Sequence, residues 1–328
     1  MTSVDAHTAR FGLSLPNRGV LIGAATTRDL LDTAVAAEET GFFDSVWVGD
    51  SLFHKPRLEA MITLTAIAGR TRRVRLGTVC LATFVIRHPI WVASQWASLD
   101  VVSEGRAVLG VCLGGGMPAE LAPFGVSPDQ RVERMTEGIE IVRRLWAEDH
   151  VSHSGTFYQF SDLSLAPKPV QRPCPIWIAS NPKGSVAGSD VVRRAMRRIG
   201  RLGDGYMTDN VSPNEFAARW AVINETARAQ GRDPAGLESS LHLMVNINDD
   251  RAKAYDEARR FLQFYYSFDP GPELIEGWVA YGPPEAVSRK IMTYVEAGCT
   301  VPILRFAAFD QLGQLKRAAR DVMPAVTV

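Results

Sequence analysis

The amino-acid sequence predicts an α/β protein of the (β/α)8 or TIM barrel class, with insertions at the C-terminal face of the strands. Short apolar runs typical of buried strands alternate with helical patterns about eight times along the chain. Strict alternation predicts a parallel sheet, and eight repeats predict that the sheet closes into a barrel. The length of 328 residues suits a single domain spanning residues 1–328. An open, doubly wound sheet is the competing fold, although it normally needs fewer strands.

The expected strands are short and apolar, as strands that are covered on both faces must be. They are residues 11–15, 45–48, 74–79, 106–111, 176–179, 205–208, 242–247 and 301–306. Between them, Ser127 and Ser212 each precede a proline and have Gln or Glu three residues later, which predicts a capping box at a helix start. Gly41 and Gly105 directly follow helical runs, where a left-handed residue ends a helix.

Two segments do not fit a minimal barrel. Residues 150–171 lead into a proline-rich run, and residues 267–284 contain FDPGPEL and YGPP. Both are interpreted as excursions between barrel units. In barrels such loops cap the active end, so we expect both segments to lie over the site.

Composition excludes several classes of function. Lys and Arg total 36, as do Asp and Glu, so no net field favours nucleic acid or an anionic membrane. The first ten residues lack the apolar run of a signal peptide, and no apolar stretch approaches the ~20 residues of a membrane span. We therefore expect a cytoplasmic enzyme. The four cysteines are far apart with no C-x-x-C pair, which argues against a structural zinc site and against a disulfide framework.

In a barrel, the chemistry belongs at the carboxyl ends of the strands. Those ends carry glycines, amides and hydroxyls, together with Asp50, Asp209 and Arg305, but no His and carboxylate cluster suited to a metal and no nucleophile elbow. His150 and His153 form an H-x-x-H pair in a polar loop with no third ligand nearby, so we interpret them as solvated. Such a site suits a protein whose cofactor supplies the chemistry, and we expect no metal.

Three consecutive glycines, Gly114, Gly115 and Gly116, follow the fourth expected strand. Residues without Cβ allow a flat ligand or a phosphate to approach the backbone. The match to G-x-G-x-x-A is a weak sign of a dinucleotide fold, because Pro118 delays the helix and the acidic Glu133 lies within an amphipathic helix. A plain tight turn is the alternative interpretation.

Several short motifs occur in an order that resembles the bacterial luciferase-like monooxygenase family over nearly the whole chain. They are SVWVGDS (45–51), RTRRVRLGT (70–78), RHP (87–89), LDVVSEGRAVLGV (99–111), FG with the following Arg131 and Glu137, PKPVQ (167–171), PIWIAS (175–180), GDGY (203–206), GPPEAV (282–287) and EAGC (296–299). The resemblance implies a (β/α)8 barrel that binds FMN or the deazaflavin coenzyme F420 at the carboxyl end. It does not distinguish the two cofactors.

The activity that the resemblance implies is an oxidoreductase, in first place a monooxygenase that acts on a small organic substrate with reduced FMN or F420 and O2. One alternative is an F420-dependent dehydrogenase or reductase that transfers hydride without O2. Another is a non-catalytic flavin-binding protein, and a metal-dependent barrel isomerase or aldolase is disfavoured by the missing ligands. The family also implies a homodimer and a separate reductase that supplies reduced flavin as candidate partners.

The resemblance also implies where the cofactor lies. A non-proline cis peptide behind the tricyclic ring is expected at Val79-Cys80, and Gly114, Gly115 and Gly116 are expected to line the same cavity. The loop after the fifth strand is expected to hold the cofactor phosphate. Hydroxyls, amides and free N–H groups ahead of a helix make an anion site, which assigns this role to Ser180, Asn181, Lys183, Gly184 and Ser185.

Two titratable residues are the candidate catalytic groups. Asp50, at the end of the second strand, is expected to face the cofactor, where desolvation raises a carboxyl pKa and suits it to proton transfer. A helix or loop cap is the alternative role for Asp50. Relatives often carry a histidine next to this position, whereas this chain has Ser51, so His54 is the candidate substitute and an idle rim histidine is its alternative role.

Overall fold

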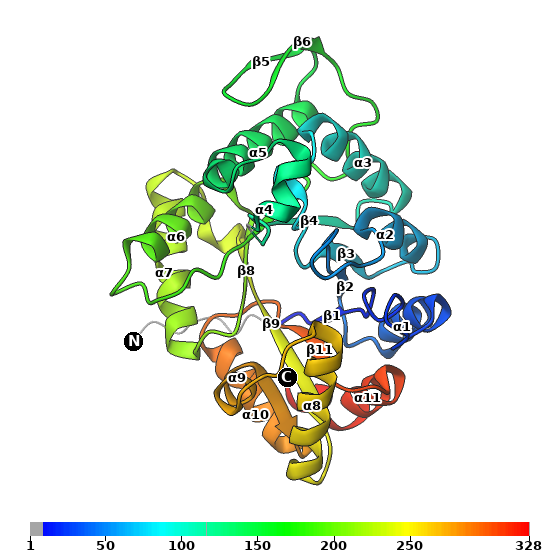
Figure 1. Cartoon of the computed structure of the whole chain (residues 1–328). Coiled ribbons are helices and arrows are strands. Elements are labelled where there is room, and N and C mark those ends of the chain that lie inside the picture. The colour runs from blue at the N-terminus through cyan, green and yellow to red at the C-terminus, as the bar shows by residue number, and fades with distance from the viewer. Residues whose placement is uncertain (1–8, 116, 328) are drawn as a thin grey trace.

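The computed structural model describes residues 9–115 and 117–327. It confirms the predicted barrel, because parallel strands pair around a closed ring in which β8 pairs with β9, β9 with β11, and β11 with β1 (Figure 1). In ring order the strands are β1 (Gly12–Ser14), β2 (Ser45–Val48), β3 (Arg75–Thr78), β4 (Ala107–Val111), β7 (Ile176–Ala179), β8 (Gly205–Asp209), β9 (Glu238–Ile247) and β11 (Ile303–Phe306). Each of them was expected from the alternation in the sequence.

A helix follows each barrel strand, and together these helices surround the ring (Figure 1). They are α1 (Thr27–Thr40), α2 (Ala60–Ala68), α3 (Pro89–Val102), α5 (Arg131–Ala147), α6 (Asp190–Leu202), α7 (Pro213–Ala229), α10 (Pro284–Glu296) and α11 (Gln311–Arg317). The connections add α4 (Pro118–Leu121), α8 (Arg251–Tyr266) and α9 (Pro272–Trp278). Within the described residues, the structure has no helix with the length and apolar character needed to cross a membrane.

The predicted helix boundaries at Gly41 and Ser127 are confirmed, and those at Gly105 and Ser212 differ in part. Gly41 has a φ of 73° and directly follows α1, as expected of a left-handed residue that ends a helix. Gly105 does not directly follow its helix, because α3 ends at Val102 and the first left-handed residue after it is Glu104, with a φ of 59°. The capping box at Ser127 is complete. At Ser212 only half of the box forms, because the Ser212 side chain accepts from the backbone N–H of Glu215 while the Glu215 carboxylate binds Arg219 instead.

Two tryptophans fill the barrel interior. Trp47 on β2 and Trp177 on β7 are fully buried, with ring centroids 5.0 Å apart. Glycines on neighbouring strands make room for them: a Cβ on Gly77 would lie 2.1 Å from the Trp47 ring, and one on Gly205 would lie 2.5 Å from the Trp177 ring. This packed layer forms the floor beneath the carboxyl end of the barrel.

Replacing Gly77 with alanine is expected to lower the free energy of unfolding by about 1–3 kcal/mol or more, because overpacking a rigid core forces side chains off their rotamers. The added methyl has no space beside Trp47, which is itself enclosed. Urea unfolding measures the change. Gly236→Ala is the matched control, since nothing lies near a Cβ at that position. Equal stability of the two variants would contradict this account of the core.

The seventh barrel strand begins earlier than expected. The sequence predicts it at residues 242–247, whereas β9 runs from Glu238 to Ile247. Ser239 and Ser240 look like loop residues in the sequence but are fully buried in the strand. The Ser239 hydroxyl donates to the Gly298 carbonyl, which satisfies its polarity inside the structure. His242 therefore lies in the middle of the strand and not at its start.

The sequence predicted that residues 150–171 lie over the site, and this prediction is wrong. This segment forms the hairpin of β5 (Val151–Ser154) and β6 (Gln159–Leu163), which leaves from the C-terminus of α5 and leads into the start of β7, at the amino end of the barrel. The hairpin packs on the outside of α5, where His153 contacts Glu137 (Figure 1). A connection from a helix to a strand starts at the opposite end from the site, so its length gave no reason to place it over the mouth.

The second excursion does reach the mouth. Residues 267–284 contain α9 and β10 (Val279–Gly282), and β10 pairs with the outer half of β9. The Ser267 hydroxyl accepts from the Arg18 guanidinium, which comes from the loop after β1. Trp278 donates to the backbone carbonyl of His242. This segment and the end of α8 thus form one wall above the barrel.

Candidate functional site

The carboxyl end of the barrel contains two neighbouring cavities. The inner cavity, of about 190 Å³, is lined by Val79, Cys80, Cys112, Ala179, Ser180, Asn181, Met207, Thr208, Asp209 and His242. The rim cavity, of about 140 Å³, is lined by Asp50, Ser51, Leu52, His54, Lys55, Arg57, Ala82, Thr83, Ile86, Gly114, Gly115, Glu120 and Leu121. The loops after β3 and β4 contribute to both, so the two cavities are parts of one mouth. This is the end at which barrel enzymes place their chemistry.

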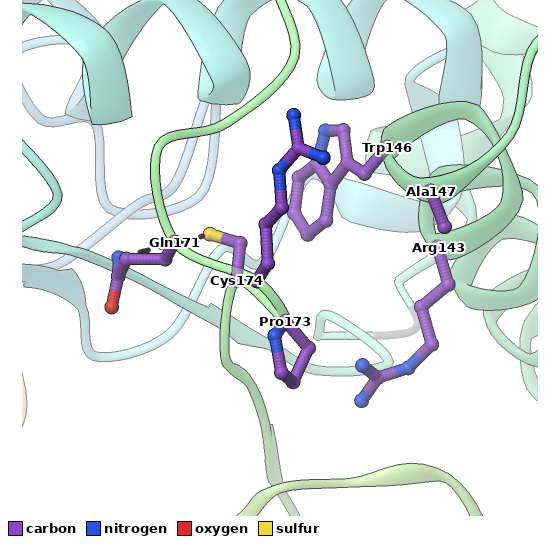
Figure 2. Close-up of a pocket in the computed structure, with 7 residues that line it drawn as sticks. Arg143, Trp146, Ala147, Gln171, Pro173 and Cys174 are labelled. Carbon is purple, nitrogen blue, oxygen red and sulfur yellow. Dashed lines mark hydrogen bonds between the residues drawn. The ribbon is translucent and has the colours of Figure 1, made fainter.

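A larger hollow of about 360 Å³ lies elsewhere, between the C-terminal end of α5 and the segment that enters β7. Figure 2 shows Trp146 and Arg143 from α5 on one side and Gln171, Pro173 and Cys174 on the other. All of these residues belong to the amino end of the barrel. The position of this hollow excludes it as the barrel's catalytic site.

The peptide bond between Val79 and Cys80 is cis, as the family resemblance implied. Both residues pack on the layer formed by Trp47 and Trp177 and line the inner cavity. The hydrogen bond with the Cys112 side chain, together with burial, raises the pKa of the Cys80 thiol well above its ordinary value. Cys80 is therefore a neutral thiol at neutral pH, and the floor of the inner cavity is apolar and uncharged at this point.

Asp50 lies in the rim cavity and is only 9% exposed. Its Oδ2 accepts from the backbone N–H and from the hydroxyl of Thr83, at 2.8 and 2.7 Å. Burial raises the pKa of Asp50, and the Thr83 hydrogen bonds oppose that rise. Asp50 therefore connects the loops after β2 and β3, as in the loop-cap alternative, while facing the mouth.

His54 lies at the outer edge of the rim cavity with an exposed side chain. Its backbone N–H donates to the Glu120 carboxylate at 2.9 Å. Glu120, on α4, is a rim carboxylate that the sequence motifs did not single out. The contact joins the loop after β2 to the segment that follows the glycines.

The glycine segment is close to the loop after β3. Gly114 has a φ of 70°, and a Cβ there would lie 2.5 Å from the Ala82 carbonyl oxygen. Its backbone carbonyl accepts from Arg131. Gly114 and Gly115 line the rim cavity, while Gly116 lies outside the described residues. The geometry at Gly114 is that of the tight turn considered as the alternative, and this turn faces the mouth.

The expected phosphate loop divides into two parts. Ser180 and Asn181 line the inner cavity, whereas Lys183, Gly184 and Ser185 are exposed on the loop before α6 and line neither cavity of the mouth. The guanidinium of Arg219, a residue that the sequence motifs did not single out, binds the backbone of this loop.

Arg219 on α7 is 2% exposed and supports the predicted phosphate loop. Its guanidinium donates to the Asn181 side-chain oxygen at 2.9 Å and to the carbonyls of Pro182 and Gly184 at 3.0 Å each. The Glu215 carboxylate accepts from the same guanidinium at 2.8 Å. Because these acceptors fix the loop backbone, the shape of the predicted phosphate site depends on a residue outside it.

Asp209 is a carboxyl that the sequence placed at a strand end without giving it a role. It lies two residues after Met207, which faces the barrel interior, so its side chain faces the interior too. Its Oδ1 accepts from the Asn181 amide at 2.7 Å, and it lines the inner cavity. Burial raises the pKa of Asp209. The sequence signal that could have identified Asp209 is its position two residues after the apolar Met207 in the same strand.

His242 pairs in register with Asp209 on the adjacent strand and lines the inner cavity. Its Nε2 is buried without a hydrogen-bond partner among the described residues. Burial, assisted by Arg305 and Arg57, lowers the pKa of His242 to about 3. The imidazole is therefore neutral at neutral pH and available for hydrogen bonding. The sequence analysis did not identify His242 because it placed this residue at the start of the strand, whereas β9 starts at Glu238.

In residues 9–115 and 117–327, no group of three or more His, Cys, Asp or Glu side chains is arranged to hold a metal ion. The mouth instead combines an apolar floor with the buried carboxyl of Asp50, the half-buried carboxyl of Asp209 and a neutral imidazole. One buried polar atom of the mouth, His242 Nε2, has no partner among the described residues and is suited to a polar flat ligand. These features fit a bound redox cofactor with polar ring edges.

Comparison with known proteins identifies the family. The sequence model described as "Luciferase-like monooxygenase" matches residues 9–272. The chain belongs to this family. The resemblance inferred from the sequence motifs is confirmed, and membership makes the chain an oxidoreductase at the level of the family.

Among curated proteins, the chain is 28% identical over 327 residues to the F420-dependent glucose-6-phosphate dehydrogenase of Amycolatopsis mediterranei, covering 90% of this chain and 94% of that protein. It is 32% identical over 244 residues to the protein of the same name from Microbacterium testaceum, covering 70% and 68%. Among solved structures, an F420-dependent secondary alcohol dehydrogenase in complex with an F420-acetone adduct has a TM-score of 0.81 at 22% identity, covering 97% and 99%. Monooxygenase RslO1 from Streptomyces bottropensis has a TM-score of 0.79 at 24% identity, covering 96% and 99%.

Proposed function

We propose that this luciferase-like protein is an F420-dependent dehydrogenase or reductase, which moves a hydride between F420 and a small organic substrate without O2. The observation that carries the proposal is the similarity, over 90% of the chain, to proteins described as F420-dependent glucose-6-phosphate dehydrogenases. The sequence analysis placed a monooxygenase first and the F420-dependent dehydrogenase or reductase second, and we reverse this ranking.

The residues of the mouth fit a deazaflavin. The Val79-Cys80 bond and Ala179 offer an uncharged bed for a flat ring system, and Ser180 and Asn181 offer polar atoms at its edges. Ser180 stands where the inner cavity meets the predicted phosphate loop, whose exposed Lys183, Gly184 and Ser185 are open to a charged tail. A glycine-containing loop ahead of a helix is suited to a phosphate.

F420, when bound, accepts or donates the hydride. The proton that accompanies the hydride is assigned to Asp209, because its carboxyl faces the inner cavity and has a raised pKa that suits a general base. Asn181 holds this carboxyl in place. His242, neutral at neutral pH, is placed to hydrogen-bond the substrate oxygen through its unpaired Nε2.

The oxygen-dependent alternative uses reduced FMN or F420 together with O2. The similarity to the solved monooxygenase is at 24% identity and supports the fold alone. Among the residues of the mouth that the structure describes, none selects for O2. We therefore place this alternative second and let cofactor binding decide between the two.

Titration of the purified protein with F420 and with FMN, followed by fluorescence, tests the proposal. F420 is expected to bind at least about tenfold more tightly than FMN, a difference of about 1.4 kcal/mol. The protein supplied with reduced F420 is expected to show no substrate-dependent O2 uptake. Tighter binding of FMN together with O2 consumption by the reduced complex would overturn the proposal in favour of the monooxygenase.

A further inference from the structure

Two of the four cysteines meet at the floor of the inner cavity. Cys80 lies two residues after the end of β3, and Cys112 directly follows β4, which pairs with β3 (Figure 1). Both are free thiols, partly exposed, and both line the inner cavity. The other two cysteines, Cys174 and Cys299, are buried and line neither cavity of the mouth. The fold therefore brings together two thiols that stand far apart in the sequence.

The pairing of β3 with β4 turns both thiols toward the cavity. The register within the two strands, if continued, would pair Leu81 with Cys112, whereas Leu81 pairs with Val111. The chain after β3 therefore holds one extra residue, as in a β-bulge. Paired side chains point to the same face of a sheet and successive side chains alternate. Cys80 and Cys112 thus share one face, opposite to that of the pair formed by Leu81 and Val111.

The two thiols are also in direct contact. The Cys112 side chain is the hydrogen-bond partner of the Cys80 thiol. Cys112 lies beyond the last paired residue of β4, so its side chain can rotate without disturbing the sheet. Two thiols in hydrogen-bond contact reach the sulfur–sulfur bond length of about 2.05 Å by side-chain rotation and a small shift of the loop after β3.

We propose that Cys80 and Cys112 form an oxidation-sensitive dithiol, which a peroxide converts into a disulfide in the cofactor-free protein and which the bound cofactor covers. The proposed hydride transfer uses neither thiol. The dithiol is therefore a modification site in the bed of the cofactor and an addition to the catalytic groups. It rests on the proposed function only for the identity of the cofactor that covers it.

The reaction balances with hydrogen peroxide as the oxidant. Cys112 reacts first, because the raised pKa of the Cys80 thiol keeps that sulfur protonated and the thiolate is the nucleophile. The Cys112 sulfur attacks a peroxide oxygen, the O–O bond breaks, and the released hydroxide takes a proton to become water, which leaves a sulfenic acid. The Cys80 sulfur then attacks the Cys112 sulfur, the S–S bond forms, and the S–O bond breaks to release a second water. Two thiols are oxidised and one peroxide is reduced to two waters.

The position of the dithiol makes its oxidation depend on the cofactor. Cys80 packs on the layer of Trp47 and Trp177, which closes the side facing the barrel interior. A peroxide therefore reaches the sulfurs from the inner cavity. The proposed bed for the ring system, which includes Cys80 and Ala179, belongs to the same cavity. A ring that lies on this bed covers both thiols and excludes the oxidant.

Incubation of the cofactor-free protein with hydrogen peroxide tests the site, with free thiols counted after denaturation and peptides analysed by mass spectrometry. The count is expected to fall from the four free thiols of the chain to two, with one linked pair of peptides that contains Cys80 and Cys112. Dithiothreitol is expected to restore the four thiols. F420 at about ten times its Kd leaves about a tenth of the molecules uncovered, so it is expected to slow the loss about tenfold.

Variants identify the order of the two sulfurs. Cys80→Ser is expected to stop at a sulfenic acid on Cys112, which dimedone labels. Cys112→Ser is expected to form no disulfide and to take up much less dimedone. The matched control is Cys174→Ala, which removes a thiol outside the mouth and is expected to form the disulfide at the wild-type rate. Circular dichroism of each variant shows whether the fold persists.

Absence of a linked Cys80 and Cys112 pair in the treated wild type would overturn the dithiol, as would equal loss of thiols in wild type and Cys112→Ser. A disulfide that forms equally fast with and without F420, in a protein that titration shows to bind F420, would overturn the claim that the cofactor covers the thiols. A disulfide that forms in a protein that does not bind F420 would support the dithiol and overturn the proposed cofactor.

Discussion

Replacing Asp209 with asparagine is expected to lower the rate of hydride transfer by about 10²- to 10⁴-fold, the usual contribution of a positioned general base. The amide has nearly the shape of the carboxyl and still accepts from Asn181, so F420 affinity is expected to change little. The wild-type rate is expected to fall with decreasing pH through the raised pKa of Asp209, above the ordinary value of 3.8. Stopped-flow measurement of F420 reduction against pH gives both results.

Asp50→Asn is the comparison that decides between the two carboxyls of the mouth. The sequence placed proton transfer on Asp50, whereas the structure shows both hydrogen bonds from Thr83 going to one of its oxygens. We therefore expect Asp50→Asn to lower the rate less than Asp209→Asn does. A larger loss in Asp50→Asn, or an unchanged pH profile in Asp209→Asn, would return the role of base to Asp50.

Asp209→Asn, which slows the reaction, is expected to stabilise the fold. Because the pKa of Asp209 is higher in the folded than in the unfolded protein, ionisation of this group opposes folding. The penalty is absent below the unfolded pKa and complete above the folded one. Asp209→Asn, which cannot ionise, is thus expected to be more stable than wild type at pH 7 and to lose this advantage as the pH falls. Urea unfolding at pH 7 and at about pH 4 measures the difference.

The barrel could be predicted from the sequence because each strand is an apolar run separated from the next by a helix with readable ends. Gly41 marks such an end by its left-handed backbone conformation. The cis bond at Val79-Cys80 came from the family resemblance alone. Nothing in the local residues VC distinguishes a cis from a trans peptide, so no propensity argument would have found it.

The mouth was harder to predict because its residues are brought together by the stagger of the strands. Asp209 and His242 become neighbours only through the register of β8 and β9. Arg57 comes from a loop, and only its approach to Gly49 places it in the barrel. Sequence positions identify the strand ends. The register of the strands decides which side chains lie at the same level along the barrel axis, and that register is set by the packing of the whole ring.

Replacing Arg219 with methionine is expected to lower the free energy of unfolding by about 3–5 kcal/mol, as removal of one partner from a buried ion pair does. The substitution leaves Glu215, Asn181 and the loop carbonyls without their donor. Because Asn181 also donates to Asp209, we expect weaker F420 binding and a slower reaction together. Thermal unfolding and F420 titration measure these effects.

Arg228→Met on the same helix is the control, because that side chain is exposed at the C-terminal end of α7. If Arg219→Met does not fold, Arg219→Lys keeps the charge near Glu215 but cannot reach all the acceptors with a planar group. Its fold is expected to persist while F420 affinity falls. Unchanged F420 affinity in Arg219→Lys would mean that the loop after β7 keeps its shape without the guanidinium, and the cofactor phosphate would then have to be placed elsewhere.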